Sequence, residues 1–368
     1  MNRHAAAFIL ACCTAALPAQ ALTWWDKGLE EALVAANDVP AKLVMLYCWE
    51  DKHETCSAMF SGTMSDERVQ KELGDFVCKG IQNDDAGKAA WTKYRVQRVP
   101  TVLFLAPSGE VVDAVLGYAT NEQLLGDLQR IRTGTDTIPE LRKALDAGTA
   151  ELPKMLLLMQ KLRQIDRADE ATQVIDAMIA KDPRCKTEQA AEAMLWRISK
   201  QSLAADIAPK DYDLTELRRF LKTQRNKRIK FLGYDRMAAA ELRREDLKAA
   251  CAAAEKAWKS IPEDEVIGWG QNIATIAYRR WKDLNAANKA FLKKALKISK
   301  ATLKAIEKRH QQEPDKTFLG NAMYLHAAVL LVNGKRKDAL SLMDQAMEID
   351  PKNESLPAAK ANWVKGNK

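Results

Sequence analysis

Residues 94–105 read YRVQRVPTVLFL, and this stretch decides the fold of the chain. The proline at position 100 separates a polar approach, which contains two arginines and a glutamine, from an apolar run at residues 101–106. Proline has no amide hydrogen and fixes its own φ angle, so it is compatible with the beginning of a strand but not with its interior. The stretch therefore predicts a bent loop that leads directly into a buried β-strand.

Further apolar runs lie on either side of this loop. Residues 43–49, LVMLYCW, form a continuous apolar run, as is typical of a strand that is covered on both faces. Residues 76–81 and 111–116 predict two more strands, and the segments between have the apolar spacing of helices. The expected helices are residues 24–36, 56–74 with an interruption near Gly62, 86–94 and 121–131. This order predicts an α/β domain.

Residues 22–133 resemble the thioredoxin family in the order of their motifs. The resemblance rests on the apolar strand that ends at Trp49, on Cys56-Ser57-Ala58-Met59, which matches the second half of the family's active-site motif, and on the loop Val99-Pro100-Thr101. It implies a thioredoxin fold with a cis peptide bond before Pro100. It also implies a substrate-binding edge, formed by Trp49, Val99, Pro100 and Thr101, that binds extended polypeptide.

The chain departs from the family at the position of the first, nucleophilic cysteine, where it reads His53-Glu54-Thr55-Cys56. A dithiol enzyme attacks with a thiolate at a helix N-terminus and then releases the mixed disulfide with a second cysteine three residues further on. With Cys56 alone, the motif contains no such pair. Dithiol chemistry is therefore not expected, and Cys56 and His53 are the candidate catalytic residues for any remaining activity.

Three interpretations of Cys56 remain open. It is a small buried hydrophobe at a core-facing position, or it is an attacking thiol favoured by the helix dipole and by a protonated His53. In the third interpretation, His53 and Cys56 bind copper or zinc together with Cys48 or a residue of a client. The whole sequence contains four histidines, so we expect no metal site and no other cofactor.

The first 21 residues have the pattern of a secretory signal peptide. Arg3 and His4 precede an apolar run at residues 5–17, and Pro18-Ala19-Gln20-Ala21 has the small residues of a cleavage site. An apolar run of about 13 residues falls short of the roughly 20 needed to span a bilayer. We therefore predict an exported, periplasmic or secreted protein with no integral membrane segment after cleavage, similar to the exported thioredoxin-like branch.

Export also permits disulfides, and five cysteines follow the signal peptide without any CxxC pair. Cys48 and Cys78 fall on strands that the family places side by side, so a bridge between them is conceivable. Neighbouring strand residues seldom meet disulfide geometry, however.

Composition changes at about Thr137, beyond which long runs rich in alanine, leucine, lysine and glutamate indicate helices. A spacing recurs there, in which small or apolar residues seven apart are followed by a proline five residues later. The three instances are Ala171, Met178 and Pro183; Ala250, Ala257 and Pro262; and Ala339, Ala346 and Pro351. Residues 327–353 resemble a tetratricopeptide repeat, so we predict an irregular, tetratricopeptide-like helical-repeat domain at residues 137–368.

Two function classes are compatible with these features. The first is a protein-interaction module whose proline-loop edge and helical repeats bind client or partner proteins, since repeat arrays present concave binding surfaces. The second is a monothiol thiol-disulfide oxidoreductase or isomerase that acts through Cys56. The net charge is +8, and its one dense basic region, at residues 218–230, is interpreted as a solvated helix face. No nucleic acid is expected as a partner.

Overall fold

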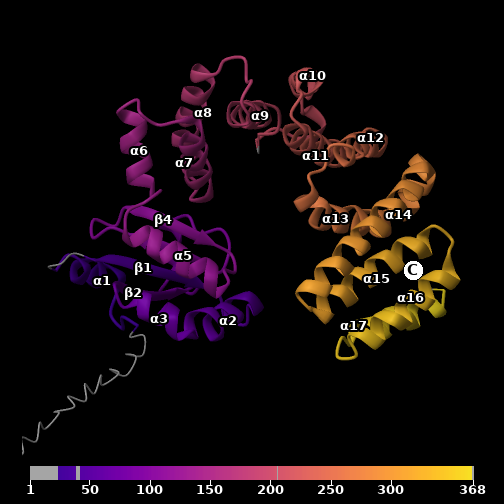
Figure 1. Cartoon of the computed structure of the whole chain (residues 1–368), viewed down its shortest axis with the longest axis horizontal. Coiled ribbons are helices and arrows are strands. Elements are labelled where there is room, and N and C mark those ends of the chain that lie inside the picture. The colour runs from indigo at the N-terminus through magenta and orange to yellow at the C-terminus, as the bar shows by residue number, and fades with distance from the viewer. Residues whose placement is uncertain (1–23, 39–41, 205, 367–368) are drawn as a thin grey trace, which may run out of the picture. The chain divides into compact units, whose positions relative to one another are not determined.

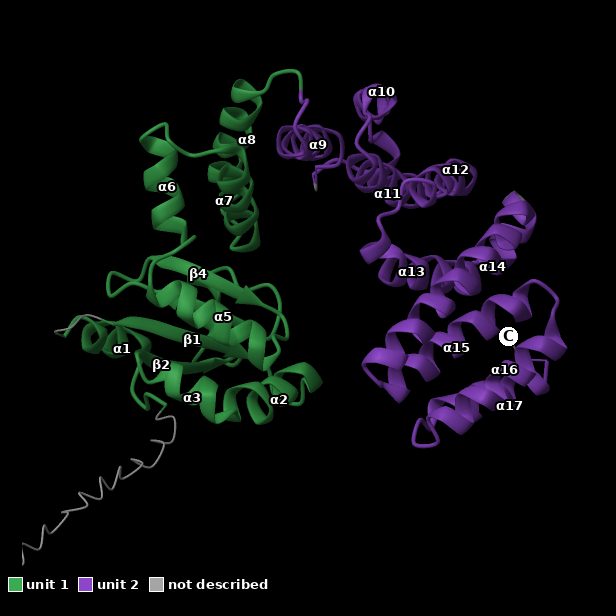
Figure 2. Cartoon of the chain, viewed as in Figure 1, with its two compact units in different colours: residues 1–184 green, residues 185–368 purple. Residues whose placement is uncertain are grey.

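The structure is a computed structural model that describes residues 24–38, 42–204 and 206–366 (Figure 1). The predicted signal peptide, residues 1–21, lies outside the described residues. The chain divides into two compact units with the boundary between Arg184 and Cys185 (Figure 2). The first unit contains a small β-sheet covered by helices, and the described part of the second unit contains helices alone. The structure therefore confirms an α/β part followed by a helical part.

The sheet of the first unit has four strands in the order β2-β1-β3-β4. Strand β1 (Leu43–Trp49) runs parallel to β2 (Phe76–Gln82) and antiparallel to β3 (Thr101–Leu105), which in turn pairs antiparallel with β4 (Val111–Leu116). The predicted strands agree with these bounds to within one residue. Continuous apolar runs mark β1 and β3 because both strands are central and buried on both faces.

Helices cover both faces of this sheet (Figure 1). On one face of the sheet, Tyr47, Phe104 and their neighbours pack against α2, α3 and α5. Helix α1 covers the opposite face, to which Leu46 points. The bounds are α1 (Leu29–Ala36), α2 (Glu54–Ser61), a 3-10 turn (Thr63–Ser65), α3 (Glu67–Leu73), α4 (Lys88–Lys93) and α5 (Asn121–Arg132). The interruption predicted near Gly62 is confirmed: Asp66 caps α3 by accepting the amides of Arg68 and Val69.

The first expected helix, residues 24–36, is wrong in its first half. Helix α1 begins only at Leu29. Gly28 is its N-cap residue, and the Gly28 amide donates to the carboxylate of Glu31 rather than to a preceding helical turn. The two tryptophans before it lie in a segment without regular secondary structure instead, and the amide of Trp25 donates to the Cys78 carbonyl of β2 at 2.8 Å. The segment thus lies along the outer edge of the sheet.

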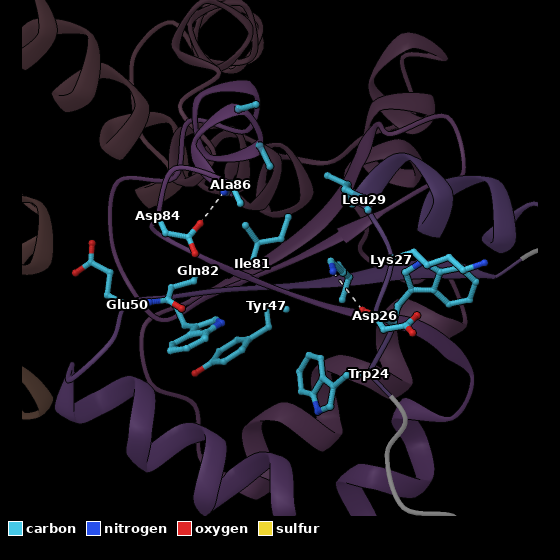
Figure 3. Close-up of a pocket in the computed structure, with 18 of the residues that line it drawn as sticks. Trp24, Asp26, Lys27, Leu29, Tyr47, Glu50, Ile81, Gln82, Asp84 and Ala86 are labelled. Carbon is cyan, nitrogen blue, oxygen red and sulfur yellow. Dashed lines mark hydrogen bonds between the residues drawn. The ribbon is translucent and has the colours of Figure 1, made fainter.

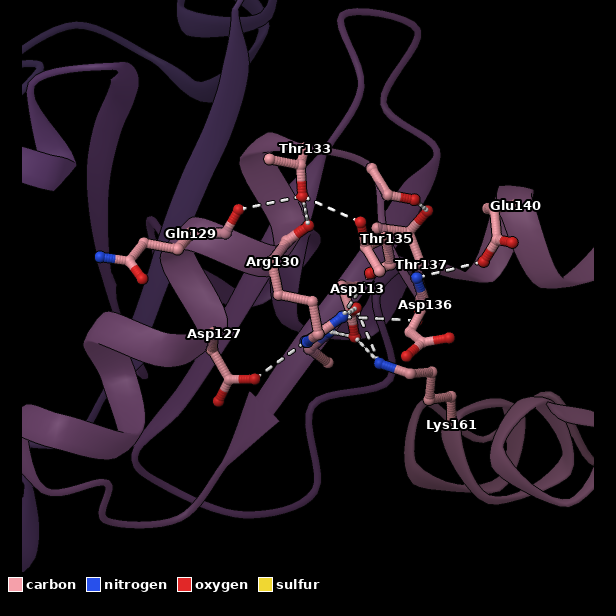
Figure 4. A network of polar contacts seen from close by, with 12 residues as sticks. Asp113, Asp127, Gln129, Arg130, Thr133, Thr135, Asp136, Thr137, Glu140 and Lys161 are labelled. Atoms are coloured by element: carbon pink, nitrogen blue, oxygen red, sulfur yellow. Dashed lines mark hydrogen bonds and ion pairs between the residues drawn. The ribbon is translucent and has the colours of Figure 1, made fainter. Parts of the chain in front are cut away.

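Three helices beyond the predicted domain end at residue 133 belong to the same compact unit. They are α6 (Ile138–Asp146), α7 (Leu152–Gln164) and α8 (Ala168–Lys181), and the first two pack against β4. An ion pair fixes this packing: Lys161 of α7 contacts both carboxylate oxygens of Asp113 in β4 at 2.7 Å (Figure 4). Arg130 of α5 contacts the same carboxylate at 2.6 Å.

The second unit is built from successive helices that pack in pairs, with apolar cores between neighbours. Its α-helices are α9 (Glu188–Ser202), α10 (Thr215–Thr223), α11 (Lys227–Arg243), α12 (Leu247–Trp258), α13 (Val266–Arg279), α14 (Trp281–Gln312), α15 (Lys316–Val332), α16 (Arg336–Ile349) and α17 (Ser355–Val364). Helix α14 is interrupted at Asn288, which has non-helical backbone angles. None of the helices in the described part of the chain is long and apolar enough to cross a membrane.

The recurring alanine and proline spacing corresponds to three helical hairpins with the same turn. In α7–α8, α11–α12 and α15–α16, a residue with positive φ lies between the helices, five positions before a buried alanine of the second helix. These residues are Asp166, Glu245 and Gly334, with φ of 57°, 63° and 79°. The left-handed conformation therefore recurs at one position of each hairpin, although glycine stands at only one of them.

This shared turn leads to a prediction about stability. A β-carbon disfavours positive φ by about 1 kcal/mol, so Glu245→Gly is expected to raise the free energy of unfolding of its hairpin by up to about that amount. Gly334→Ala is the matched reverse change, because an added β-carbon would meet nothing within 4 Å and would act through φ alone. We expect it to lower the free energy by about 1 kcal/mol in urea unfolding. Equal stability of the two variants would contradict this.

Candidate functional site

The candidate residues His53 and Cys56 begin helix α2. His53 is the N-cap residue in extended conformation, and its Nδ1 lies 3.0 Å from the Thr55 hydroxyl. Cys56 is the third residue of the helix and only 3% exposed. The helix N-terminus therefore presents a half-buried imidazole, whereas the thiol points toward the sheet.

The Cys56 side of the helix is held by Tyr47 of β1. The Tyr47 hydroxyl donates to the Cys56 carbonyl at 3.0 Å. Burial, and secondarily the neighbouring Cys56 thiol, raise the pKa of the Tyr47 phenol above its usual value. A neutral phenol therefore stands beside the thiol.

The proline loop lies at the beginning of β3, and its Val99–Pro100 peptide bond is cis. Thr101 is buried and donates its hydroxyl to the Arg98 carbonyl at 2.8 Å, while the Pro100 carbonyl accepts the amide of Gly117 at 2.7 Å. Val99 is half-buried. Among the described residues, none donates to its carbonyl or accepts from its amide. The loop is thus fixed on both sides of one unpaired backbone position.

His53 and Val99 line the same cavity, which has a volume of about 450 Å³. Trp91 lies in its wall, and the buried indole nitrogen of Trp91 has no partner within the described part of the chain. Asn83 donates to Glu50 at 2.6 Å across the same cavity. The sequence analysis did not identify Asn83 or Trp91, because neither belongs to a motif.

Cys56 and Trp49 line a second and larger cavity of about 1050 Å³ (Figure 3). Its aromatic wall includes Trp24, which stacks on Phe60 with ring centroids 5.9 Å apart. The predicted site residues are therefore divided: His53 and Val99 lie together in one cavity, and Cys56 and Trp49 lie in the other. Pro100 and Thr101 are buried and line neither of these two cavities.

The remaining cysteines offer Cys56 no partner in the described part of the chain. All five cysteines there are unbridged. Cys78 pairs with Met45 in the sheet register, and Cys48 lies three residues further along β1, so the two thiols point to opposite faces. Burial raises the pKa of each to about 12. Within the described residues, no three histidine, cysteine, aspartate or glutamate side chains form a group that would hold a metal ion.

A solved structure is similar to part of this chain. It is the solution structure of a thioredoxin from Thermus thermophilus, which is 27% identical over 30% of this chain and 87% of that chain, with a TM-score of 0.27. No protein-family model matches the chain, and no curated protein sequence does.

Proposed function

We propose that this chain is an exported thioredoxin-fold protein that binds client or partner proteins through the edge at Val99 and through its helical repeats, without dithiol redox activity. The unpaired backbone at Val99 carries the proposal. An extended polypeptide that pairs with this position gains main-chain hydrogen bonds, and its side chains find specificity in the adjoining cavity. His53 and Trp91 line that cavity, which offers the ligand the half-buried imidazole of His53.

The arrangement of thiols supports the proposed absence of dithiol chemistry. Dithiol exchange needs an accessible thiolate and a second thiol nearby to resolve the mixed disulfide. Cys56 is 3% exposed, and Cys48 lies on the sheet face opposite to Tyr47, which contacts Cys56. One observation favours the second candidate function, a monothiol exchange enzyme: Cys56 does border the larger cavity, so a client disulfide that enters the cavity would meet its thiol.

The helical hairpins support the second half of the proposal. Three hairpins share one turn and one buried alanine position, and this recurrence along the chain supports a tetratricopeptide-like interpretation, since such proteins repeat an equivalent unit. We propose that the repeats select partner proteins, with extended segments of the same partners engaging Val99.

The proposal predicts that Val99→Pro weakens polypeptide binding while Val99→Ala does not. The proline variant removes the unpaired amide, and the loss of one hydrogen bond corresponds to about a tenfold increase in Kd. The probe is a permanently unfolded polypeptide whose cysteines are carboxymethylated, so that no disulfide can form. Calorimetric titration of the full chain measures the affinity, and circular dichroism verifies the fold of each variant.

Two outcomes separate the candidate functions. Equal affinity of wild type and a folded Val99→Pro variant would remove the Val99 edge from the function. Covalent capture of a probe that carries a disulfide, by wild type but not by Cys56→Ser, would establish the monothiol enzyme instead: the Cys56 thiolate attacks one sulfur of that disulfide and the other sulfur leaves as a thiolate.

A further inference from the structure

Strand β2 is an outer strand of the sheet, and its backbone groups alternate between β1 and the open side. The Asn83 amide donates to the Trp49 carbonyl of β1 at 3.0 Å, so the odd-numbered residues face β1. The Cys78 carbonyl accepts the amide of Trp25 on the other side. Because successive residues of a strand point their backbone groups in opposite directions, Cys78, Gly80 and Gln82 face outward.

Only part of this outer edge is covered. Trp25 pairs with Cys78, and the Lys79 side chain donates to the Trp25 carbonyl at 3.2 Å, which holds the segment in place. At the other end Gly87 lies against the Gln82 carbonyl, where an added β-carbon would come within 2.0 Å of that oxygen. Between them, the amide and carbonyl of Gly80 have no hydrogen-bond partner among the described residues.

The cavity of about 1050 Å³ surrounds this unpaired position on both faces of the strand. Figure 3 shows Tyr47 and Trp24 on one side of the strands and Ile81, Ala86 and Leu29 on the other. Gly80 has no side chain to fill the aromatic side: a β-carbon there would lie 3.7 Å from both Trp24 and Trp49. An added strand projects side chains alternately to both faces, so space on both faces of an unpaired edge suits a strand.

The charge of the cavity favours a basic ligand. Six carboxylate side chains line it against four lysines. Lys93 pairs with Glu30 at 3.3 Å, which leaves five carboxylates against three lysines. The cavity is therefore negative, with an aromatic wall.

We propose that the Gly80 edge of β2 binds an extended segment of a partner polypeptide in which apolar and basic residues alternate. Backbone pairing with Gly80 supplies the main-chain bonds, as in other edge-strand complexes. The apolar side chains lie on the aromatic wall of Trp24 and Tyr47, and the basic ones meet the carboxylates. This site goes beyond the proposed function, because Val99 does not line the cavity at Gly80.

The test uses the full chain and synthetic seven-residue peptides in which valine, isoleucine or phenylalanine alternates with lysine. Binding is measured by titration, and amide hydrogen exchange is followed at Gly80. Alternate residues of a strand face opposite edges, so N-methylation of one alternate set blocks pairing with β2, whereas methylation of the other set faces solvent. We expect N-methylation of one alternate set to lower the affinity about tenfold and N-methylation of the other set to leave it unchanged. Binding of the unmethylated peptide is expected to slow amide exchange at Gly80.

Variants complete the test. Trp24→Ala is expected to weaken binding, whereas Val34→Ala, at a position 72% exposed on α1, leaves it unchanged. Val99→Pro is expected to retain the slowed exchange at Gly80 on peptide binding, and this local measurement separates the site from the edge at Val99. The proposal is overturned if no peptide binds, if both methylated sets bind equally, or if glutamate replaces lysine without loss. Slow exchange at Gly80 in the peptide-free chain would overturn it too, since residues 1–23 or a second copy would then occupy the edge.

Discussion

The variant His53→Cys is expected to reduce protein disulfides, whereas the wild-type chain is not. His53 is the N-cap of α2 and Cys56 is its third residue, so the substitution creates the spacing in which a second thiol resolves a mixed disulfide. The new thiol would stand at a half-buried helix N-terminus, where the dipole stabilises the thiolate. Lowering a thiol pKa from about 8.5 to about 7 raises the thiolate fraction at pH 7 roughly 15-fold.

The reduction of insulin disulfides by dithiothreitol, followed as turbidity, measures this gain. We expect His53→Cys to accelerate it at least about tenfold over wild type, in line with the thiolate fraction. His53→Ser is the matched control, since it keeps a small polar N-cap without a thiol, and the double variant His53→Cys/Cys56→Ser tests the resolving step. A folded His53→Cys variant that forms its disulfide but stays inactive would show that the buried setting of Cys56, and not the missing cysteine, excludes the chemistry.

The sheet was predictable because its signals are local. Apolar runs of strand length, and the proline and glycine at positions 100 and 62 that interrupt regular structure, lie within a few residues of the elements they determine. Strands β1 and β3 have the clearest apolar runs because they are buried on both faces. The hairpins were harder to recognise. Asp166 and Glu245 adopt the same positive φ as Gly334, so the glycine that normally marks such a turn is missing from two of three repeats.

The candidate site was predictable only in part, because it depends on long-range placement. The motif placed His53 and Cys56 together along the chain, but the start of a helix directs them to two different cavities. Trp24 and Trp25 had the spacing of a helix, whereas a capping bond at Gly28 leaves them on the edge of β2. The cavity that each side chain lines and the pairing of Trp25 with Cys78 also depend on strands distant in sequence, which no local pattern reports.

The second large effect is a loss of stability on substitution of Asp113, a buried charged residue in the otherwise apolar strand β4. Its carboxylate is fully buried and accepts from Lys161 at 2.7 Å and from Arg130 at 2.6 Å. Asp113→Asn preserves the shape but leaves the buried Lys161 without its counter-charge and leaves Arg130 with Asp127 alone. Removing one partner from a buried ion pair costs about 3–5 kcal/mol. We expect a loss of that size in the opening free energy of the β4 amides, measured by hydrogen exchange with the full chain.

Asp127→Asn is the matched control, because Asp127 pairs with the same arginine at 2.9 Å but is 33% exposed. Exposed pairs contribute about 0–1 kcal/mol, so this variant is expected to differ little from wild type.

The exchange of α7 amides shows whether α7 opens together with the sheet. Since Lys161 joins α7 to β4, Asp113→Asn is expected to loosen α7 together with β4, which would make residues 138–164 part of the cooperative unit of the sheet. Loosening of β4 alone would instead place the folding boundary near residue 133, with α6 and α7 only docked on the sheet.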